Sequence, residues 1–320
     1  MKYQHGTHSK SQLSAIKYYH LNPSRLFKSF SIITVLLIAA NFLFSTSVYA
    51  AGGRVEALQM PAWLERNGEL LAIIPGMELE GGDKLTTGTS ARLLLRMDEG
   101  SFVKLGENAE LNLDTLIPAQ QDTDIFEAAL EVIKGAFRFT TSALGQKRSR
   151  KVDVRIGSIT AGIRGTDIWG SSNLEKDILC LIEGKITAKK QGEPEFAMED
   201  PLSFFIAPKN APALPVAPVP QAKLAKWADE TELKSGAGVL SIDGQWAVNL
   251  MSVASESSAR PVMASLAAAG YATSIESAVV NGNNWYRLRV NGFKTRQDAS
   301  AFASSIDGTN GITGTWIVRF

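Results

Sequence analysis

Residues 246–253 read WAVNLMSV, and forty positions later residues 286–293 read YRLRVNGF. Both stretches alternate apolar and polar residues, which is the pattern of a β-strand with one buried face. The same offset also superposes the segments that follow. The matched positions are Val248 with Leu288, Leu250 with Val290, Val253 with Phe293, Ala259 with Ala299, Val262 with Phe302 and Leu266 with Ile306. The last eighty or so residues are therefore an internal repeat.

Each half of the repeat continues with small or apolar residues at helical spacing, which places them on one stripe of a helix. The first helix has Ser255 or Ser257 as its N-terminal cap and ends at Gly270. The second begins near Thr295 and ends before the Asn-Gly pair at 310–311. These signals predict one helix in each half.

A further strand follows each helix, at about 272–280 and 315–319. The sequence thus predicts a ferredoxin-like α+β domain of βαββαβ order over residues 241–320. It has four antiparallel strands, both helices on one face and the other face uncovered.

The uncovered face is where such a sheet can meet a ligand. If Val248 and its equivalents point toward the helices, strand alternation makes Asn249, Trp285, Arg287 and Arg289 point away from them. A tryptophan beside two arginines is unusual on a face that only meets water.

These features resemble the SPOR domain, the sporulation-related repeat of bacterial envelope proteins. The resemblance is carried by VNLMSV at 248–253, by the helical spacing of residues 259–270, by WYRLRVNGF at 285–293 and by the Thr-Trp pair at 315–316. It implies binding to peptidoglycan, preferentially to glycan strands stripped of their stem peptides, as found at division septa.

The resemblance also implies a set of peptidoglycan-binding residues. Indole rings stack on sugar faces, and amide, hydroxyl and guanidinium groups supply directional hydrogen bonds. Met251 replaces a usual glycine and adds bulk near the groove, and strand parity leaves either face open to Trp316. The alternative is a half-buried sheet whose arginines are solvated and whose tryptophans pack an edge. The implied residues are Asn249, Ser252, Trp285, Arg287, Arg289 and Trp316.

The start of the chain has the pattern of an export signal. Residues 1–28 carry basic residues and no acid, residues 30–44 are almost wholly apolar, and 48–50 read Val-Tyr-Ala. This pattern predicts a signal peptide over residues 1–50, cleaved after Ala50. An uncleaved anchor is the alternative. In both cases the remainder lies in the periplasm, with contact to the inner membrane only if the leader is retained.

Export restricts the chemistry that the mature chain can perform. Its three histidines, His5, His8 and His20, all lie in the leader. Cleavage therefore removes Ser-His and Cys-His nucleophile pairs, imidazole bases and nearly every zinc site. Cys180, the single cysteine, is expected to be a buried small hydrophobe. We expect no enzyme, cofactor or metal.

Residues 53–207 form a succession of short strands separated by glycines, which is typical of an all-β domain, a sandwich or a wound roll. Residues 126–133 fit a strand or a short helix. The plainest strands are ARLLLRM, SFVKL, AELNL, AFRFT, KVDVRI and DILCLIEGKIT.

The turns of this region resemble the FecR domain, a periplasmic β domain first recognised in iron-transport signalling. The resemblance spans about 54–190 and rests on GDKLTTG at 82–88, the turn at 98–101, Lys-Gly at 134–135 and IRGTDI at 163–168. In the last motif, Arg164 and Thr166 fit a partner-binding surface or, as we favour, an architectural turn.

Residues 208–240 are expected to be a linker. Its five prolines predict an extended chain of roughly 40 Å that separates the domains. Leu224, Trp227 and Leu233 then show helical spacing, which predicts a short helix lying on either neighbour.

Three functions from different classes compete. The first is a non-enzymatic envelope protein that binds peptidoglycan glycan strands and contacts another envelope protein through its β domain. The second is a FecR-type signalling regulator, although residues 1–28 are short for a segment that engages a sigma factor. The third is a wall hydrolase using carboxylates such as Glu78, Glu80, Asp98 or Glu99. A nucleic-acid partner is excluded, since the net charge is only +1 and an exported chain meets no RNA.

Overall fold

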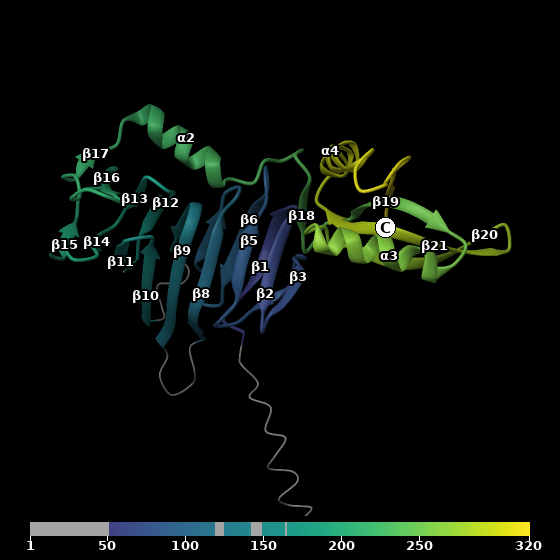
Figure 1. The fold of residues 1–320 in the computed structure, drawn as a ribbon, viewed down its shortest axis with the longest axis horizontal. Coiled ribbons are helices and arrows are strands. Elements are labelled where there is room, and N and C mark those ends of the chain that lie inside the picture. Colours follow the sequence, from purple (N-terminus) through teal and green to yellow (C-terminus); the bar gives the residue numbers. More distant parts are fainter. Residues whose placement is uncertain (1–50, 119–124, 142–148, 164) are drawn as a thin grey trace, which may run out of the picture. The chain divides into compact units, whose positions relative to one another are not determined.

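The computed structural model describes residues 51–118, 125–141, 149–163 and 165–320, all within one unit of the chain (Figure 1). The expected signal peptide of residues 1–50 and the turn residue Arg164 lie outside the described residues. Among the described helices, none is long and apolar enough to cross a membrane.

The N-terminal part of the described chain is all-β, as expected, and its strands form two sheets. Strands of the first sheet are β1 (Gly53–Gln59), β4 (Glu78–Leu79), β6 (Arg92–Met97), β7 (Phe102–Leu105), β12 (Asp167–Ser172), β13 (Lys176–Glu183), β16 (Ser203–Pro208) and β17 (Ala217–Pro218). Strands of the second sheet are β2 (Ala62–Arg66), β3 (Glu69–Ala72), β5 (Lys84–Thr87), β8 (Glu110–Ile117), β10 (Ser149–Ile156), β11 (Ile159–Ile163), β14 (Ile186–Lys190) and β15 (Phe196–Met198).

The long strand β9 (Ile125–Thr140) belongs to both sheets. Its first part pairs with β8 and β10, and its last part pairs with β7 and β12. The change occurs at Gly135, whose φ of 83° is one that other residues rarely adopt. The ambiguous run 126–133 is therefore strand.

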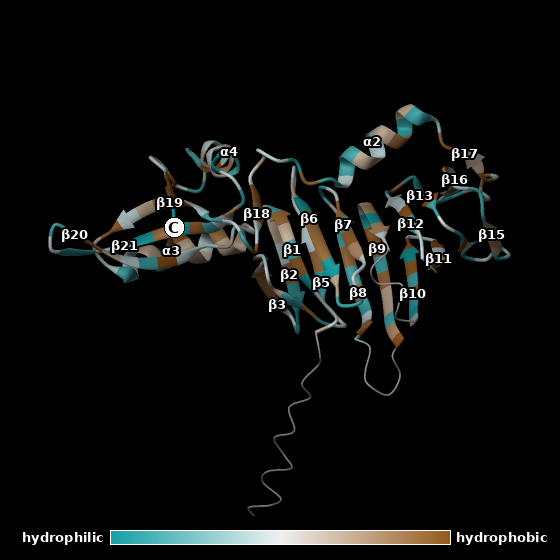
Figure 2. Cartoon of the chain, turned by 180° about the vertical axis from the view of Figure 1, so that it is seen from behind, coloured by the Kyte–Doolittle hydropathy of each residue, from teal (hydrophilic) through white to brown (hydrophobic). Residues whose placement is uncertain are grey.

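One hydrophobic core lies between the two sheets. Alternate residues of β6 (such as Leu93 and Leu95) and of β8 (such as Leu111 and Leu113) are fully buried in the same cluster. The chain passes repeatedly from one sheet to the other, so it is wound as a roll around this core. Hydrophobic and hydrophilic residues alternate along many of these strands (Figure 2).

The proline-rich segment does not form the free spacer that we expected. The backbone N–H of Leu214 donates to Ile206 O at 2.9 Å, and that of Val219 donates to Leu202 O at 2.7 Å. Strand β17 within this segment pairs with β16. Prolines are tolerated here because an edge strand can spare some of its N–H groups.

The predicted short helix exists as α2 (Gln221–Thr231) and packs on the β region. The indole of Trp227 stacks on that of Trp169, with centroids 4.6 Å apart and planes 10° apart. Phe204 meets Trp227 edge-on. The helix therefore covers an aromatic cluster on the outside of the first sheet.

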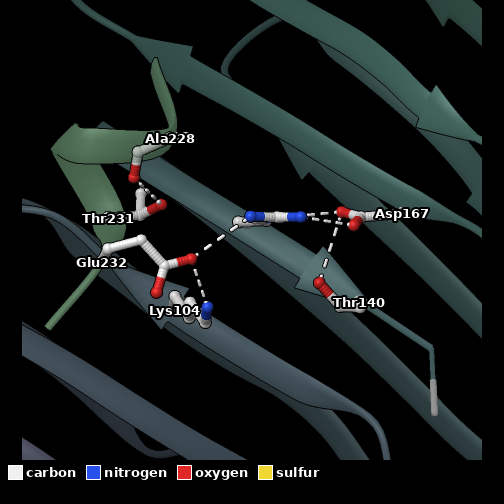
Figure 3. A network of polar contacts seen from close by, with 7 residues as sticks. Lys104, Thr140, Asp167, Ala228, Thr231 and Glu232 are labelled. Atoms are coloured by element: carbon white, nitrogen blue, oxygen red, sulfur yellow. Dashed lines mark hydrogen bonds and ion pairs between the residues drawn. The ribbon is translucent and has the colours of Figure 1, made fainter. Parts of the chain in front are cut away.

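A polar network fixes the end of α2 (Figure 3). Glu232 pairs with Lys104 and with Arg138, and Arg138 in turn makes two hydrogen bonds to Asp167, at 2.9 and 2.6 Å. Asp167 also accepts from Thr140. The network joins α2 to strands β7, β9 and β12.

A short strand, β18 (Val239–Ser241), follows α2. It pairs antiparallel with β1, and its Leu240 also pairs with Phe293 of the C-terminal domain. The carboxylate of Asp298 accepts the backbone N–H groups of Gly236 and Val239 at 2.7 and 3.1 Å. The linking segment is thus held by contacts to both domains.

The C-terminal domain has the predicted βαββαβ order. Its strands are arranged β20-β21-β19-β22, and both helices pack on one face of this sheet, over buried Val248, Leu288 and Val290. Ser255 and Thr295 are the N-terminal caps, and Thr295 Oγ1 accepts from Asp298 N at 3.0 Å. The elements are β19 (Trp246–Val253), α3 (Glu256–Ala268), β20 (Ser274–Val280), β21 (Asn283–Phe293), α4 (Arg296–Ile306) and β22 (Trp316–Arg319).

Candidate functional site

The sheet face without helices, here called the open face, brings five of the six expected site residues to one partly exposed surface. Cross-strand partners share a face of a sheet. Trp316 pairs with Asn249, Asn249 with Arg289, and Arg289 with Ser274. These four residues form one row across the sheet. Ser252, Arg287 and Glu276 form a second, neighbouring row. Trp285 lies beyond the second row, opposite Ala278.

A β-bulge in β19 explains how Asn249 and Ser252 both lie on this face. Strict alternation would put residues three apart on opposite faces. The pairing shifts between Asn249 and Met251, so Leu250 and Met251 both point to the hydrophobic core. Met251 therefore does not add bulk to the open face, as the sequence suggested, because the bulge turns it toward the helices.

Asn249 departs from its expected role as an exposed donor. It is fully buried, since the larger side chains of Arg289 and Trp316 flank it on the neighbouring strands. Neither its Nδ2 nor its Oδ1 has a hydrogen-bond partner among the described residues. Both atoms of this amide are thus unsatisfied beneath the surface, which is unfavourable for the fold.

Trp316 takes the open face, which the sequence pattern left undecided. The guanidinium Cζ of Arg287 lies 5.9 Å from the centroid of the Trp316 ring. Trp285 lies four residues along β21 from Arg289, which is in the same cross-strand row as Trp316. Strand β22, which carries Trp316, is two strands away from β21. The Cα atoms of the two tryptophans are therefore roughly 16 Å apart. A linear polymeric ligand is long enough to contact both indole rings at once.

Glu276 and Asn291 belong to the open face, and sequence reasoning missed both. Glu276 pairs with Arg289 at 2.8 Å and accepts from Asn291 Nδ2 at 2.9 Å. Arg289 is therefore partly neutralised and has fewer free donors than expected. The alternation of residues 274–280, SIESAVV, could have placed Ser274 and Glu276 on one face.

Polar atoms without a partner gather on this face. Besides the amide of Asn249, they include Nε of Arg287, Nε of Arg289 and Oδ1 of Asn291. Buried polar atoms normally find partners, and a group of such atoms at a surface is typical of a site that hydrogen-bonds to a ligand. The open face therefore combines unsatisfied donors and acceptors with two indole rings.

Two family models match the chain. Residues 243–319 match the SPOR domain, and residues 83–187 match the FecR protein family. The chain carries a SPOR domain after a FecR-like domain. The SPOR domain supports peptidoglycan binding, and the FecR-like domain supports a role in envelope signalling. Both are binding or regulatory domains typical of the bacterial envelope.

None of the curated proteins compared matches the chain. Two crystal structures described as a "putative anti-sigma factor" from Parabacteroides distasonis are similar. The 1.65 Å structure is 15% identical, with a TM-score of 0.36, over 45% of this chain and 64% of that one. The 2.50 Å structure is 14% identical, with a TM-score of 0.37, over 69% and 90%.

The turn at 82–88 of the FecR-like domain has an architectural role. Asp83 of the GDKLTTG turn is buried, and its carboxylate accepts hydrogen bonds from Nε and Nη2 of Arg66, both at 2.7 Å. Glu80 forms an ion pair with the same guanidinium. These hydrogen bonds raise the pKa of Arg66 above its ordinary value. Thr166 is buried, and its hydroxyl has no hydrogen-bond partner among the described residues.

The carboxylates considered for hydrolysis lie in different surroundings. Glu99 is buried within 3.9 Å of Arg150, and Glu80 belongs to the Arg66 cluster. Cys180 is buried too, and burial raises the pKa of its thiol to about 12. This thiol is therefore a packing group and a poor nucleophile.

Proposed function

We propose that the chain is a non-enzymatic periplasmic protein that binds glycan strands of peptidoglycan through the open face of its SPOR domain, preferring strands without stem peptides. Trp285 and Trp316 stack on sugar rings. Arg287 and Arg289 donate hydrogen bonds at the surface, and Ser252 donates or accepts them. The unpartnered amide of Asn249 lies directly beneath them. The FecR-like domain contacts another envelope protein.

The observation that supports this proposal is the concentration of unpartnered polar atoms on the face that carries the two indole rings. Sugars present apolar ring faces and equatorial hydroxyl groups, which match aromatic and polar side chains respectively. A stem peptide would add bulk and charge at alternate sugars. A strand free of these peptides can lie flat along the sheet.

The proposal is tested by sedimentation of the full-length protein with insoluble sacculi, before and after an amidase has removed the stem peptides. Binding should rise after the treatment. Trp285→Ala should abolish it while the protein stays folded by circular dichroism. Val279→Ala is the matched control, since Val279 is exposed on the same domain and pairs opposite Asn284 rather than with the open-face row. Wild-type protein that remains in the supernatant under both conditions would refute glycan binding.

A further inference from the structure

A groove continues the open face beyond Asn291. Its volume is about 420 Å³. Ser274 and Asn291 of the SPOR domain line the side of the groove next to the open face, and Phe320, the last residue, also lines the groove. The residues at this end of the face are small, with Ala247 opposite Asn291 and Gly292 next to it, so the sheet surface is hollow here.

The FecR-like domain supplies the opposite wall of this groove, with Ile74 and Pro75. Ile74 is 49% exposed, Ile242, which directly follows β18, is 51% exposed, and Phe320 is 65% exposed. Three large apolar side chains around one hollow exceed the scattered exposure that is normal for a protein surface. The wall is therefore suited to apolar contact with a ligand.

Two hydrogen bonds hold this wall against the SPOR domain. The indole N–H of Trp63 on β2 donates to Ala268 O at 3.0 Å, and Ala62 N donates to Gly270 O at 3.1 Å. Strand β3, which leads into Ile74, pairs with β2. The wall is thus tied to the end of α3, close to the start of β20.

The polar side of the groove offers an acceptor. Asn291 Nδ2 donates to Ser274 Oγ at 3.0 Å and to the Glu276 carboxylate, and this orientation leaves Oδ1 as the free end of the amide. Oδ1 is buried and has no partner in the described chain, and Thr273 Oγ1 beside it is in the same state. The ligand that fits must present an N–H or O–H group here and an apolar group to the wall.

We infer that this groove is a subsite for the acetamido group of an N-acetylated aminosugar, at the end of the same glycan strand. The acetamido N–H donates to Asn291 Oδ1, and its methyl group packs on Ile74 and Phe320. The inference rests on the proposed function and extends it, because it makes the FecR-like domain part of the glycan site. Asn291 lies six residues, roughly 20 Å, from Trp285 along β21, so only a longer oligosaccharide reaches from one to the other.

The test measures the affinity of the full-length protein for purified peptide-free glycan oligomers of increasing length. Ile74→Asn should weaken binding of long oligomers about tenfold, the effect of removing a buried aliphatic contact, and leave short oligomers unaffected. Leu70→Asn is the matched control, because Leu70 is 60% exposed on β3 and lies outside the groove. Chemically de-N-acetylated long oligomers should bind the wild type as weakly as intact ones bind Ile74→Asn.

Equal affinities of the two variants for long oligomers would overturn the subsite, and so would an equal loss for short and long oligomers. Insensitivity of the wild type to de-N-acetylation would also overturn it. Failure of the proposed function gives a different result, since the wild type would then bind no glycan of any length.

Discussion

The guanidinium of Arg287 lies over the indole ring of Trp316, with its Cζ 5.9 Å from the ring centroid. The two residues are on strands that are not neighbours, since β19 lies between β21 and β22. The contact therefore crosses the whole width of β19 and fixes the orientation of both side chains on the open face. An aromatic ring held in this way is prepared to stack on a sugar.

Arg287→Ala should lower the affinity for peptide-free glycan about tenfold, because it removes a cation–π contact and a set of directional donors. The measurement is a sedimentation isotherm with amidase-treated sacculi. Arg260→Ala is the charge-matched control, since Arg260 is exposed on α3, whose helix packs on the other face of the sheet. Equal losses for the two variants would show that Arg287 acts only through net charge.

Asn249→Leu should stabilise the SPOR domain and weaken glycan binding. It replaces an amide with two unpartnered atoms by an apolar group of similar shape, and relief of such an unpaired group is worth about 1 kcal/mol. Chemical denaturation gives the stability, and the sacculus assay gives the binding. Asn284→Leu, at an exposed position of β21, should change neither. A destabilised Asn249→Leu protein would show that the amide has a partner in solution.

The fold of the SPOR domain could be predicted closely because its repeat fixes strand and helix order together. Ser255, the N-terminal cap of α3, was one of two candidates, and α4 was expected to begin near Thr295, which is its cap. The bulge at Leu250 was not, because a bulge leaves the apolar pattern of a strand almost unchanged. The alternation of side chains therefore predicted that Met251 lies near the binding groove, whereas it packs against the hydrophobic core.

The linker was misjudged for a different reason. Its proline content is typical of an extended spacer, but it does not indicate whether other residues of the segment, such as Leu214 and Val219, hydrogen-bond to a nearby strand. Trp227 signalled a helix correctly, but its stacking partner Trp169 is distant in sequence. A contact between residues so far apart in the sequence cannot be predicted from the spacing of residues within one segment.

Trp227→Ala should destabilise the FecR-like domain by about 3 kcal/mol and detach α2 from it. The reason is that Trp227 is buried and stacks on Trp169, which is itself buried. Near-ultraviolet circular dichroism would lose the signal of the stacked indoles, and the urea midpoint would fall. Lys226→Ala, at the exposed neighbouring position, should leave both unchanged. An unaltered near-ultraviolet spectrum for Trp227→Ala would contradict the packing of α2.

Cys180 should not react with a maleimide in the native protein at pH 8. Its thiol is buried, and its pKa of about 12 leaves almost no thiolate at that pH. The same reagent should label the protein fully in guanidinium chloride, which exposes the thiol and serves as the control. Mass spectrometry counts the adducts. Rapid native labelling would mean that β13 opens easily, because Cys180 lies in the middle of this strand.

Asp177 should contribute stability that is lost in acid. Burial alone would raise its pKa, but hydrogen bonds from Lys209, Ser158 and Ser172 outweigh burial and lower the pKa below its ordinary value of 3.8. A carboxyl group with a lower pKa in the folded chain stabilises fully above the unfolded value and loses this contribution as the pH falls through the folded value. Wild-type melting temperatures should therefore fall more steeply below about pH 4 than those of Asp177→Asn, which should be less stable at pH 7. Asp229→Asn, at an exposed position, should keep the wild-type acid slope. If the melting temperatures of wild type and Asp177→Asn fell equally steeply below about pH 4, this carboxyl group would have the same pKa in the folded and the unfolded chain.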